Sequence, residues 1–350
     1  MINVFPQTKI YVACPAGAVT GGPELLHQLV HNLRATGINA YIFYHPVVEK
    51  PKPLAYEKYD APYVFNIADE EDNVLIIPEI FPFINFLKSY KRVRKVIWWL
   101  SVNNFFSSYL ISTWRGKFLY LIGRLSGING EIIAERLSQR QKLKGFLNLK
   151  NIDLHMVQSF YAFNFLRASG VDEKKIVYLS DYLNDEFLIY NFEESGIQKE
   201  NIVLYNPKKG FEFTKKIIEY GRDINFVPII NMSRREVIET MKKAKVYIDF
   251  GNHPGKDRMP REAAMLGCCV ITGKRGSAAF FEDVPIKEEY KFEDKEENIP
   301  AIVSRIRECI ENYEEKIKDF EDYRKWILYE KERFINDMKN IFVLQTERCC

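Results

Sequence analysis

The segment GNHPGKDRMPREAAMLGCCVITG spans residues 251–273 and reads as a charged loop, a short helix led by Pro260 and a buried strand. The residues just before it, VYIDF at 246–250, form a largely apolar, strand-like run that ends at this loop. Strands that are apolar throughout and alternate with helices are typical of parallel sheets covered on both faces. The segment therefore predicts an α/β domain with its chemistry at a strand end.

The same alternation extends from this segment toward the N-terminus. Strand-like runs at 201–207 and 225–230 alternate with helical patterns at 211–221 and 233–244. Another alternating series starts with KIYVACPA at 9–16, a glycine turn, and the helix PELLHQLVHNLRATG at 23–37. Two such series in 350 residues exceed one hydrophobic core, so the chain is predicted to be α/β with two Rossmann-like, doubly wound domains.

A polar, acidic stretch that begins at Tyr182 separates the two series and places the domain boundary. The predicted domains are residues 1–182 and 183–320, followed by a helical segment at 321–350 that packs back on the first domain. The formal net charge of +3 provides no dense basic field, so a nucleic-acid partner is not expected. Cysteine spacing indicates neither a zinc site nor a disulfide framework, and the N-terminal residues lack a charged leader with an apolar run. A cytoplasmic location is therefore expected.

Three loops lead from strands into helices, where backbone N–H groups can bind anions. Gly21 and Gly22 would let the backbone approach a phosphate, although a plain helix start explains them equally well. Lys208 and Lys209 would place two cations at a helix N-terminus, against the alternative of solvated surface lysines. None of these loops has the GxGxxG pattern, so no nicotinamide cofactor is predicted.

The loop at 251–267 is the most informative, because it crowds charges of both signs around Gly255. Its basic side chains could neutralise a departing diphosphate, and Arg258 is the candidate here. Asp257 or His253 would orient sugar hydroxyls, and Glu262 would accept hydrogen bonds from a ribose or sugar. The alternative for Glu262 is a carboxylate that only stabilises a helix dipole.

These segments, in their order and spacing, resemble the retaining GT-B glycosyltransferases, whose two domains face a central cleft. The resemblance rests on GGPELLHQLVHNLRATG, NPKKGFEFTKKII, SRREVIETMKKAKVYIDFG and PREAAMLGCCVITG. It implies an acceptor-binding first domain and a second domain that binds a nucleotide sugar. It also implies that Gly21, Gly22, and Lys208 or Lys209 face the donor phosphates, that Glu262 binds the ribose, and that GSAAF at 276–280 offers backbone donors through Ser277 and Ala278.

One position departs from that family, which usually has two glutamates eight positions apart. Pro254 stands where the earlier glutamate is expected, so the catalytic candidates become Asp257, His253 and Glu262, and the stereochemical outcome is left open. No metal or cofactor is expected, because the sequence contains no convincing acidic pair or metal motif. A GT-B-like sugar-nucleotide epimerase and a non-catalytic nucleotide-sugar binding protein remain alternatives to a hexosyltransferase of surface polysaccharide synthesis.

The acceptor is expected to be a glycan or a lipid-linked compound. Residues 88–120 combine five basic residues between Lys88 and Lys95 with many aromatic residues, which indicates a peripheral membrane surface. The alternative, which we favour because strand periodicity explains the two tryptophans, is that VIWWL at 96–100 is a buried strand preceded by solvated basic residues.

Overall fold

The chain forms two compact units, Met1–Asp181 with Glu332–Cys350 and Tyr182–Lys331. This computed structural model describes residues 1–126, 128, 130–140, 151–192, 194 and 196–346. The predicted boundary after residue 182 lies beside this division. The predicted segment 321–350 is itself divided, and its residues up to Lys331 belong to the second unit.

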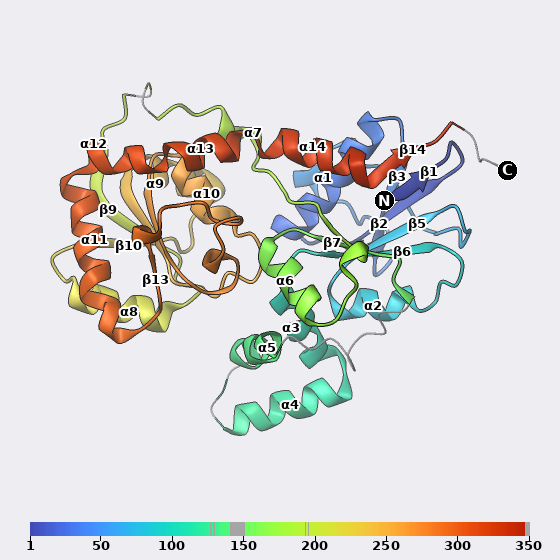
Figure 1. Cartoon of the computed structure of the whole chain (residues 1–350), viewed down its shortest axis with the longest axis horizontal. Helices are drawn as coiled ribbons and strands as arrows, with labels where there is room; N and C mark the ends of the chain where they lie inside the picture. Colours follow the sequence, from blue (N-terminus) through green and yellow to red (C-terminus); the bar gives the residue numbers. More distant parts are fainter. Residues whose placement is uncertain (127, 129, 141–150, 193, 195, 347–350) are drawn as a thin grey trace. The chain divides into compact units, whose positions relative to one another are not determined.

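In the described part of the first unit, seven strands form one parallel sheet (Figure 1). In spatial order they are β4 (Tyr63–Val64), β3 (Asn39–His45), β2 (Lys9–Pro15), β5 (Val74–Pro78), β6 (Arg94–Trp99), β7 (Leu154–Val157) and β8 (Ile176–Tyr178). The register places Ile10 beside Ala40 on one side and beside Val74 on the other. A separate parallel pair joins β1 (Ile2–Val4) to β14 (Phe342–Leu344).

The central strands of this sheet are buried because their side chains are apolar on both faces. Trp98 and Trp99 are fully buried in β6, and their indole N–H groups donate to the Leu179 carbonyl and to His155 Nδ1. The prediction that VIWWL forms a buried strand is thus confirmed. The helices of this unit are α1 (Gly21–Ala35), α2 (Phe81–Leu87), α3 (Val102–Ser112), α4 (Trp114–Leu125), α5 (Gly130–Gln139) and α6 (Phe160–Ala168).

The second unit contains a five-stranded parallel sheet among its described residues. Its spatial order is β10 (Asn225–Pro228), β9 (Glu200–Tyr205), β11 (Ala244–Asp249), β12 (Cys269–Gly273) and β13 (Lys291–Phe292). The helices are α7 (Asp185–Leu188), α8 (Phe211–Tyr220), α9 (Arg234–Lys243), α10 (Arg258–Met265), α11 (Ile299–Glu311), α12 (Tyr313–Lys316) and α13 (Glu321–Leu328), and α14 (Glu330–Ile341) starts here and continues in the first unit.

Local sequence explains where several of these elements begin. Ser233 and Glu236 form a reciprocal capping box at the start of α9. The helix expected to start at Pro260 starts two residues earlier, at Arg258, so Glu262 lies in its second turn and not at its head. No helix among the described residues is both long and apolar enough to cross a bilayer.

Candidate active site

Two loops of the second unit meet at the carboxyl ends of β9 and β11, which are neighbours in the sheet. Gly210 precedes α8 with a φ of 61°, and a Cβ there would lie 2.0 Å from the Phe250 carbonyl oxygen. Only glycine allows this close approach. The loop before α8 and the loop before α10 are therefore held together, as expected for ligand-binding loops at strand ends.

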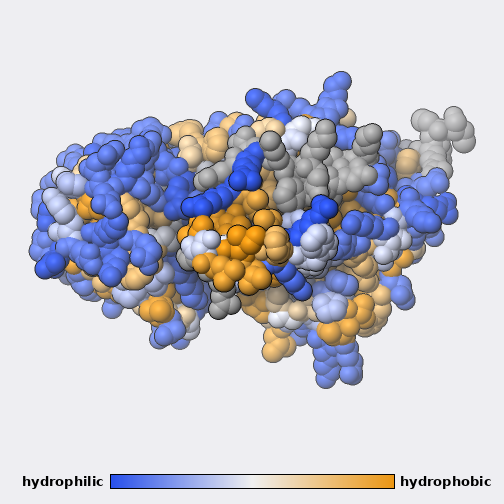
Figure 2. Space-filling model, turned by 90° about the horizontal axis from the view of Figure 1, so that it is seen from below, coloured by the Kyte–Doolittle hydropathy of each residue, from blue (hydrophilic) through white to orange (hydrophobic). Residues whose placement is uncertain are grey.

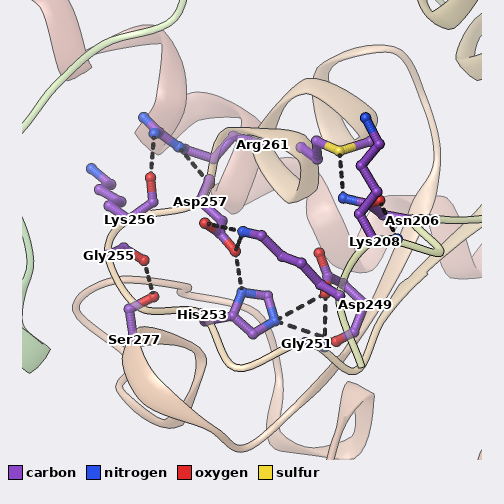
Figure 3. Close-up of polar contacts among 12 residues, drawn as sticks. Asn206, Lys208, Asp249, Gly251, His253, Gly255, Lys256, Asp257, Arg261 and Ser277 are labelled. Carbon is purple, nitrogen blue, oxygen red and sulfur yellow. Dashed lines mark hydrogen bonds and ion pairs between the residues drawn. The ribbon is translucent and has the colours of Figure 1, made fainter. Parts of the chain in front are cut away.

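Four charged side chains form one cluster where these two loops meet, and Figure 3 labels three of them, Asp249, His253 and Asp257. The Lys209 ammonium lies 2.9 Å from both carboxylate oxygens of Asp257. His253 lies between two carboxylates, with Nδ1 3.1 Å from Asp257 Oδ2 and Nε2 3.4 Å from Asp249 Oδ1. We call Lys209, Asp249, His253 and Asp257 the charged quartet.

Burial alone would disfavour a charged imidazole, yet Asp249 and Asp257 outweigh it and raise the pKa of His253 to about 9. Burial would likewise raise the pKa of Asp257, but His253 and Lys209 hold it below its ordinary value. The contacts within the quartet therefore favour the protonated form of His253 and the ionised form of Asp257. His253 is a hydrogen-bond donor in this state and cannot act as a proton acceptor.

Sequence reasoning missed Asp249, which supports the quartet from the end of β11. One of its carboxylate oxygens accepts from the Tyr247 hydroxyl at 2.9 Å and the other from the Gly251 N–H at 3.0 Å. The signal was present, because Asp249 ends an apolar strand directly before the charged loop. His253 itself has a φ of 34°, a left-handed conformation that non-glycine residues rarely adopt.

Lys208 lies beside the quartet but has a different environment. Its backbone N–H donates to the Asn206 side chain at 3.0 Å, while its side chain is exposed. Its ammonium makes no ion pair with any residue that the structure describes. Lys208 thus remains available to an anion, whereas Lys209 is already paired with Asp257.

Two other cations of the loop are structural. The buried Lys256 ammonium lies 2.8 Å from one oxygen of Glu330, and Arg261 donates to the other at 2.7 Å. Lys256 also lies 4.2 Å from the centre of the Trp326 ring. These contacts fix the start of α10 to the helices at the end of this unit.

Arg258 and Glu262 lie one turn apart on α10. Burial raises the pKa of Glu262, which is only partly exposed, and the nearby Arg258 charge opposes that rise. The predicted roles of both residues toward a donor remain predictions, and the structure places them outside the charged quartet.

Ser277 and Ala278 belong to the short 3-10 helix Gly276–Ala279, which contacts the charged loop. The Ser277 N–H donates to the His253 carbonyl at 2.9 Å, and the Ser277 hydroxyl donates to the Gly255 carbonyl at 2.7 Å. The Ala278 N–H donates to the Arg275 carbonyl. These groups support the loop in this structure. Their predicted binding to phosphates remains a prediction.

Gly21 and Gly22 begin α1 in the first unit, at the carboxyl edge of its sheet. A Cβ at Gly22 would only make ordinary contact, 3.6 Å from the Leu100 side chain. The Leu100 N–H donates to Glu79, a buried carboxyl whose pKa is raised to about 7 by burial. Glu79 follows β5 directly and was also missed by sequence reasoning.

Ligand atoms of Asp249, His253 and Asp257 all lie within 4.8 Å of one another, a spacing that could hold a metal ion. The Lys209 ammonium already neutralises Asp257, and the two carboxylates share a protonated His253. A divalent cation would have to displace both positive charges. The donor set does not favour a metal, and the expected absence of one remains a prediction.

No model of a known protein family matches the chain. Sucrose-phosphate synthase from Thermosynechococcus elongatus superposes with a TM-score of 0.59 at 12% identity, covering 96% of this chain and 98% of that one. HepE from Anabaena, solved with UDP-glucose, superposes with a TM-score of 0.55 at 11% identity, covering 95% and 98%.

The chain has the GT-B fold of these glycosyltransferases. The predicted fold class is thereby confirmed. An alpha-1,6-glucosyltransferase of Actinobacillus pleuropneumoniae is 29% identical over 138 residues, which is 36% of this chain. The chain spans 41% of the length of that relative.

Proposed function

We propose that the chain is a hexosyltransferase that moves a sugar from a nucleoside diphosphate donor to a hydroxyl group of a glycan or lipid-linked acceptor. The reaction would proceed with retention and without a metal ion, in the synthesis of a surface polysaccharide. The proposal is supported by the GT-B fold and by the partial sequence match to a glucosyltransferase.

One observation carries the proposal: an exposed cation, Lys208, lies next to the charged quartet where α8 and α10 begin. When the bond between the anomeric carbon and the phosphate oxygen breaks, its electron pair remains on the diphosphate. The acceptor oxygen forms the new bond to the anomeric carbon and passes its proton to an oxygen of the departing diphosphate. Lys208, Arg258 and the N-terminus of α8 would stabilise the charge on the leaving group.

The quartet would act on the donor sugar through Asp257 and His253. The imidazole, whose two ring nitrogens face Asp249 and Asp257, would hold Asp257 in place together with Lys209, and Asp257 would accept hydrogen bonds from hydroxyl groups of the sugar. Pro254 replaces the acid that the resemblance leads one to expect, and these two neighbours supply polar groups in its vicinity. Glu262 would accept from the ribose.

The test is a panel of nucleotide sugars incubated with the full chain, with and without chelator, and release of the nucleoside diphosphate as the readout. Lys208→Ala is expected to lower turnover roughly tenfold to a hundredfold, because one charged hydrogen bond to the leaving group is worth a few kcal/mol. Lys215→Ala is the matched control, since Lys215 is an exposed lysine of α8 that pairs only with Glu219 among the described residues.

Other outcomes identify the alternatives. Interconversion of the donor sugar without transfer would indicate an epimerase. Thermal stabilisation by a nucleotide sugar with no release of diphosphate would indicate a binding protein. Equal turnover of Lys208→Ala and Lys215→Ala would contradict the assigned site, and loss of turnover in chelator would contradict metal independence.

A further inference from the structure

Helix α4 (Trp114–Leu125) of the first unit buries glycine and exposes large apolar residues, the reverse of a helix that packs on a core. Gly116 and Gly123 are its buried positions. A Cβ at Gly116 would lie 2.2 Å from the Tyr109 carbonyl oxygen, and one at Gly123 would lie 2.2 Å from the Ile133 side chain. These two glycines therefore form the face that contacts α3 and α5.

The opposite face of α4 is an exposed apolar stripe. Because successive residues are about 100° apart on a helix, one face gathers every third or fourth residue, and that face lies opposite Gly116 and Gly123. Its members are Trp114, Phe118, Leu121, Ile122 and Leu125, all exposed. Trp114 is 75% exposed, although it is one of only four tryptophans in the chain. Figure 2, seen from the side on which α4 lies in Figure 1, shows a contiguous hydrophobic patch.

Along the sequence, the charge on both sides of α4 has a single sign as far as Gly130. No Asp or Glu occurs between Ile80 and Gly130, whereas that segment contains eight Lys and Arg residues. Two of them, Arg115 and Lys117, are exposed and follow Trp114 closely, so the helical rotation places them on the two flanks of the stripe. Arg115 also lies 5.5 Å from the Trp114 ring centre.

We infer that α4 is an interfacial helix that lies on a membrane surface containing anionic lipids. An apolar stripe with tryptophan and basic flanks matches the two layers of such a surface, acyl chains below and anionic headgroups above. A protein partner could also cover the apolar stripe, but an apolar protein–protein interface does not require that both flanks be basic. Membrane contact was expected anywhere in residues 88–120, and the inference assigns it to α4. Trp98 and Trp99 are buried, whereas Trp114 is the exposed tryptophan of that segment.

This inference does not depend on sugar transfer, and its test measures lipid binding alone. The full chain is mixed with vesicles of phosphatidylcholine, with or without phosphatidylglycerol, and centrifuged. It is expected to sediment with the anionic vesicles, less so at high salt, and to remain in solution with the neutral ones. The emission of Trp114 should shift to shorter wavelength on binding. Trp114→Phe should remove that shift but retain sedimentation.

Two variants test the stripe against an equally apolar surface elsewhere. Phe118→Ser with Leu125→Ser changes residues that are 59% and 81% exposed, whereas Phe281→Ser with Ile189→Ser changes residues that are 64% and 82% exposed in the second unit. The first pair should lower the vesicle partition coefficient about tenfold or more, because it removes two apolar side chains from the acyl layer. The second pair should leave it unchanged.

Charge reversal provides a second, independent comparison. Arg115→Glu with Lys117→Glu should abolish binding to anionic vesicles, and Lys91→Glu with Arg92→Glu, exposed residues of the loop before β6, should weaken it much less. Sedimentation that depends on Lys91 and Arg92 but not on α4 would overturn the inference. The inference would also be overturned if the protein bound no vesicles but formed a dimer, and the α4 variants converted that dimer to a monomer.

Discussion

His253 combines three unusual properties in one residue: it is buried, it lies between two carboxylates, and its φ is 34°. A left-handed conformation costs a non-glycine residue about 1 kcal/mol or more. The ion pairs with Asp249 and Asp257 hold the residue in it. The same two carboxylates raise the pKa of His253 and hold its imidazole between them.

The raised pKa of His253 should make the unfolding free energy depend on pH. His253 has a folded-state pKa of about 9 against 6.5 when unperturbed, so its contribution to stability is complete below about pH 6.5 and is lost as pH rises through 9. His253→Gln removes this titration but keeps a residue with the same left-handed strain. The difference in unfolding free energy between wild type and variant should shrink by on the order of 3 kcal/mol across that range. Denaturant unfolding at several pH values measures it, and a constant difference would show that His253 is not held protonated.

Gly276 makes a second prediction at this scale. Its φ is 56°, and a Cβ would lie 2.0 Å from the His253 carbonyl oxygen. Gly196, also in the second unit, has a φ of 66° but nothing within 4 Å of that position. Both substitutions by alanine incur left-handed strain, and Gly276→Ala should cost about 2 kcal/mol more because two loops must separate. Equal losses of unfolding free energy would mean that the loops are not held this closely.

At the scale of elements, α10 and α14 are joined through one carboxylate. Glu330 is buried and takes Lys256 and Arg261 on its two oxygens, at 2.8 and 2.7 Å. Removing one partner of a buried ion pair leaves uncompensated charge, which is far more costly than breaking an exposed pair.

Glu330→Gln should therefore lower the unfolding free energy by about 3 kcal/mol or more. Glu321→Gln is the control, because Glu321 makes an exposed, solvent-screened ion pair with Lys325 on α13, and its loss should leave the unfolding free energy nearly unchanged. Thermal unfolding of both variants measures the contrast. If Glu330→Gln is as stable as Glu321→Gln, Glu330 does not form the buried ion pairs with Lys256 and Arg261.

The elements also show what sequence can and cannot predict. The strands at 9–15 and 244–249 and the helices at 211–220 and 234–243 follow from apolar periodicity and capping residues, which are local. The partner of Lys256 and Arg261 is 69 residues beyond Arg261, and no local pattern points to Glu330. Lys209 and Asp257 were both singled out, but their pairing across two loops depends on Gly210, whose close approach to Phe250 only the folded chain reveals.

At the scale of the whole molecule, the candidate residues are divided between two units that have separate cores. The second unit holds the charged quartet, Lys208, Arg258 and Glu262, while Gly21 and Gly22 belong to the first. Sequence order could assign residues to units because each alternating series is continuous along the chain. The end of the chain was expected to pack on the first domain, and its residues from Glu332 onward belong to the first unit, but sequence order could not predict that β14 pairs with β1 from the opposite terminus.

Hydrogen exchange with and without a nucleoside diphosphate tests the predicted donor site in both units at once. A ligand that binds the folded state protects the backbone it contacts and stabilises the unit it binds. UDP, the nucleotide in the structure of HepE with UDP-glucose, is the first ligand to use. We expect slower exchange at residues 206–211 and 251–262, and also around Gly21 and Gly22 if the donor phosphates reach that loop as the resemblance implies. Protection confined to the second unit would remove both glycines from the donor site but leave Lys208 in it. Protection that persists unchanged in Lys208→Ala at the same UDP concentration would place the diphosphate elsewhere.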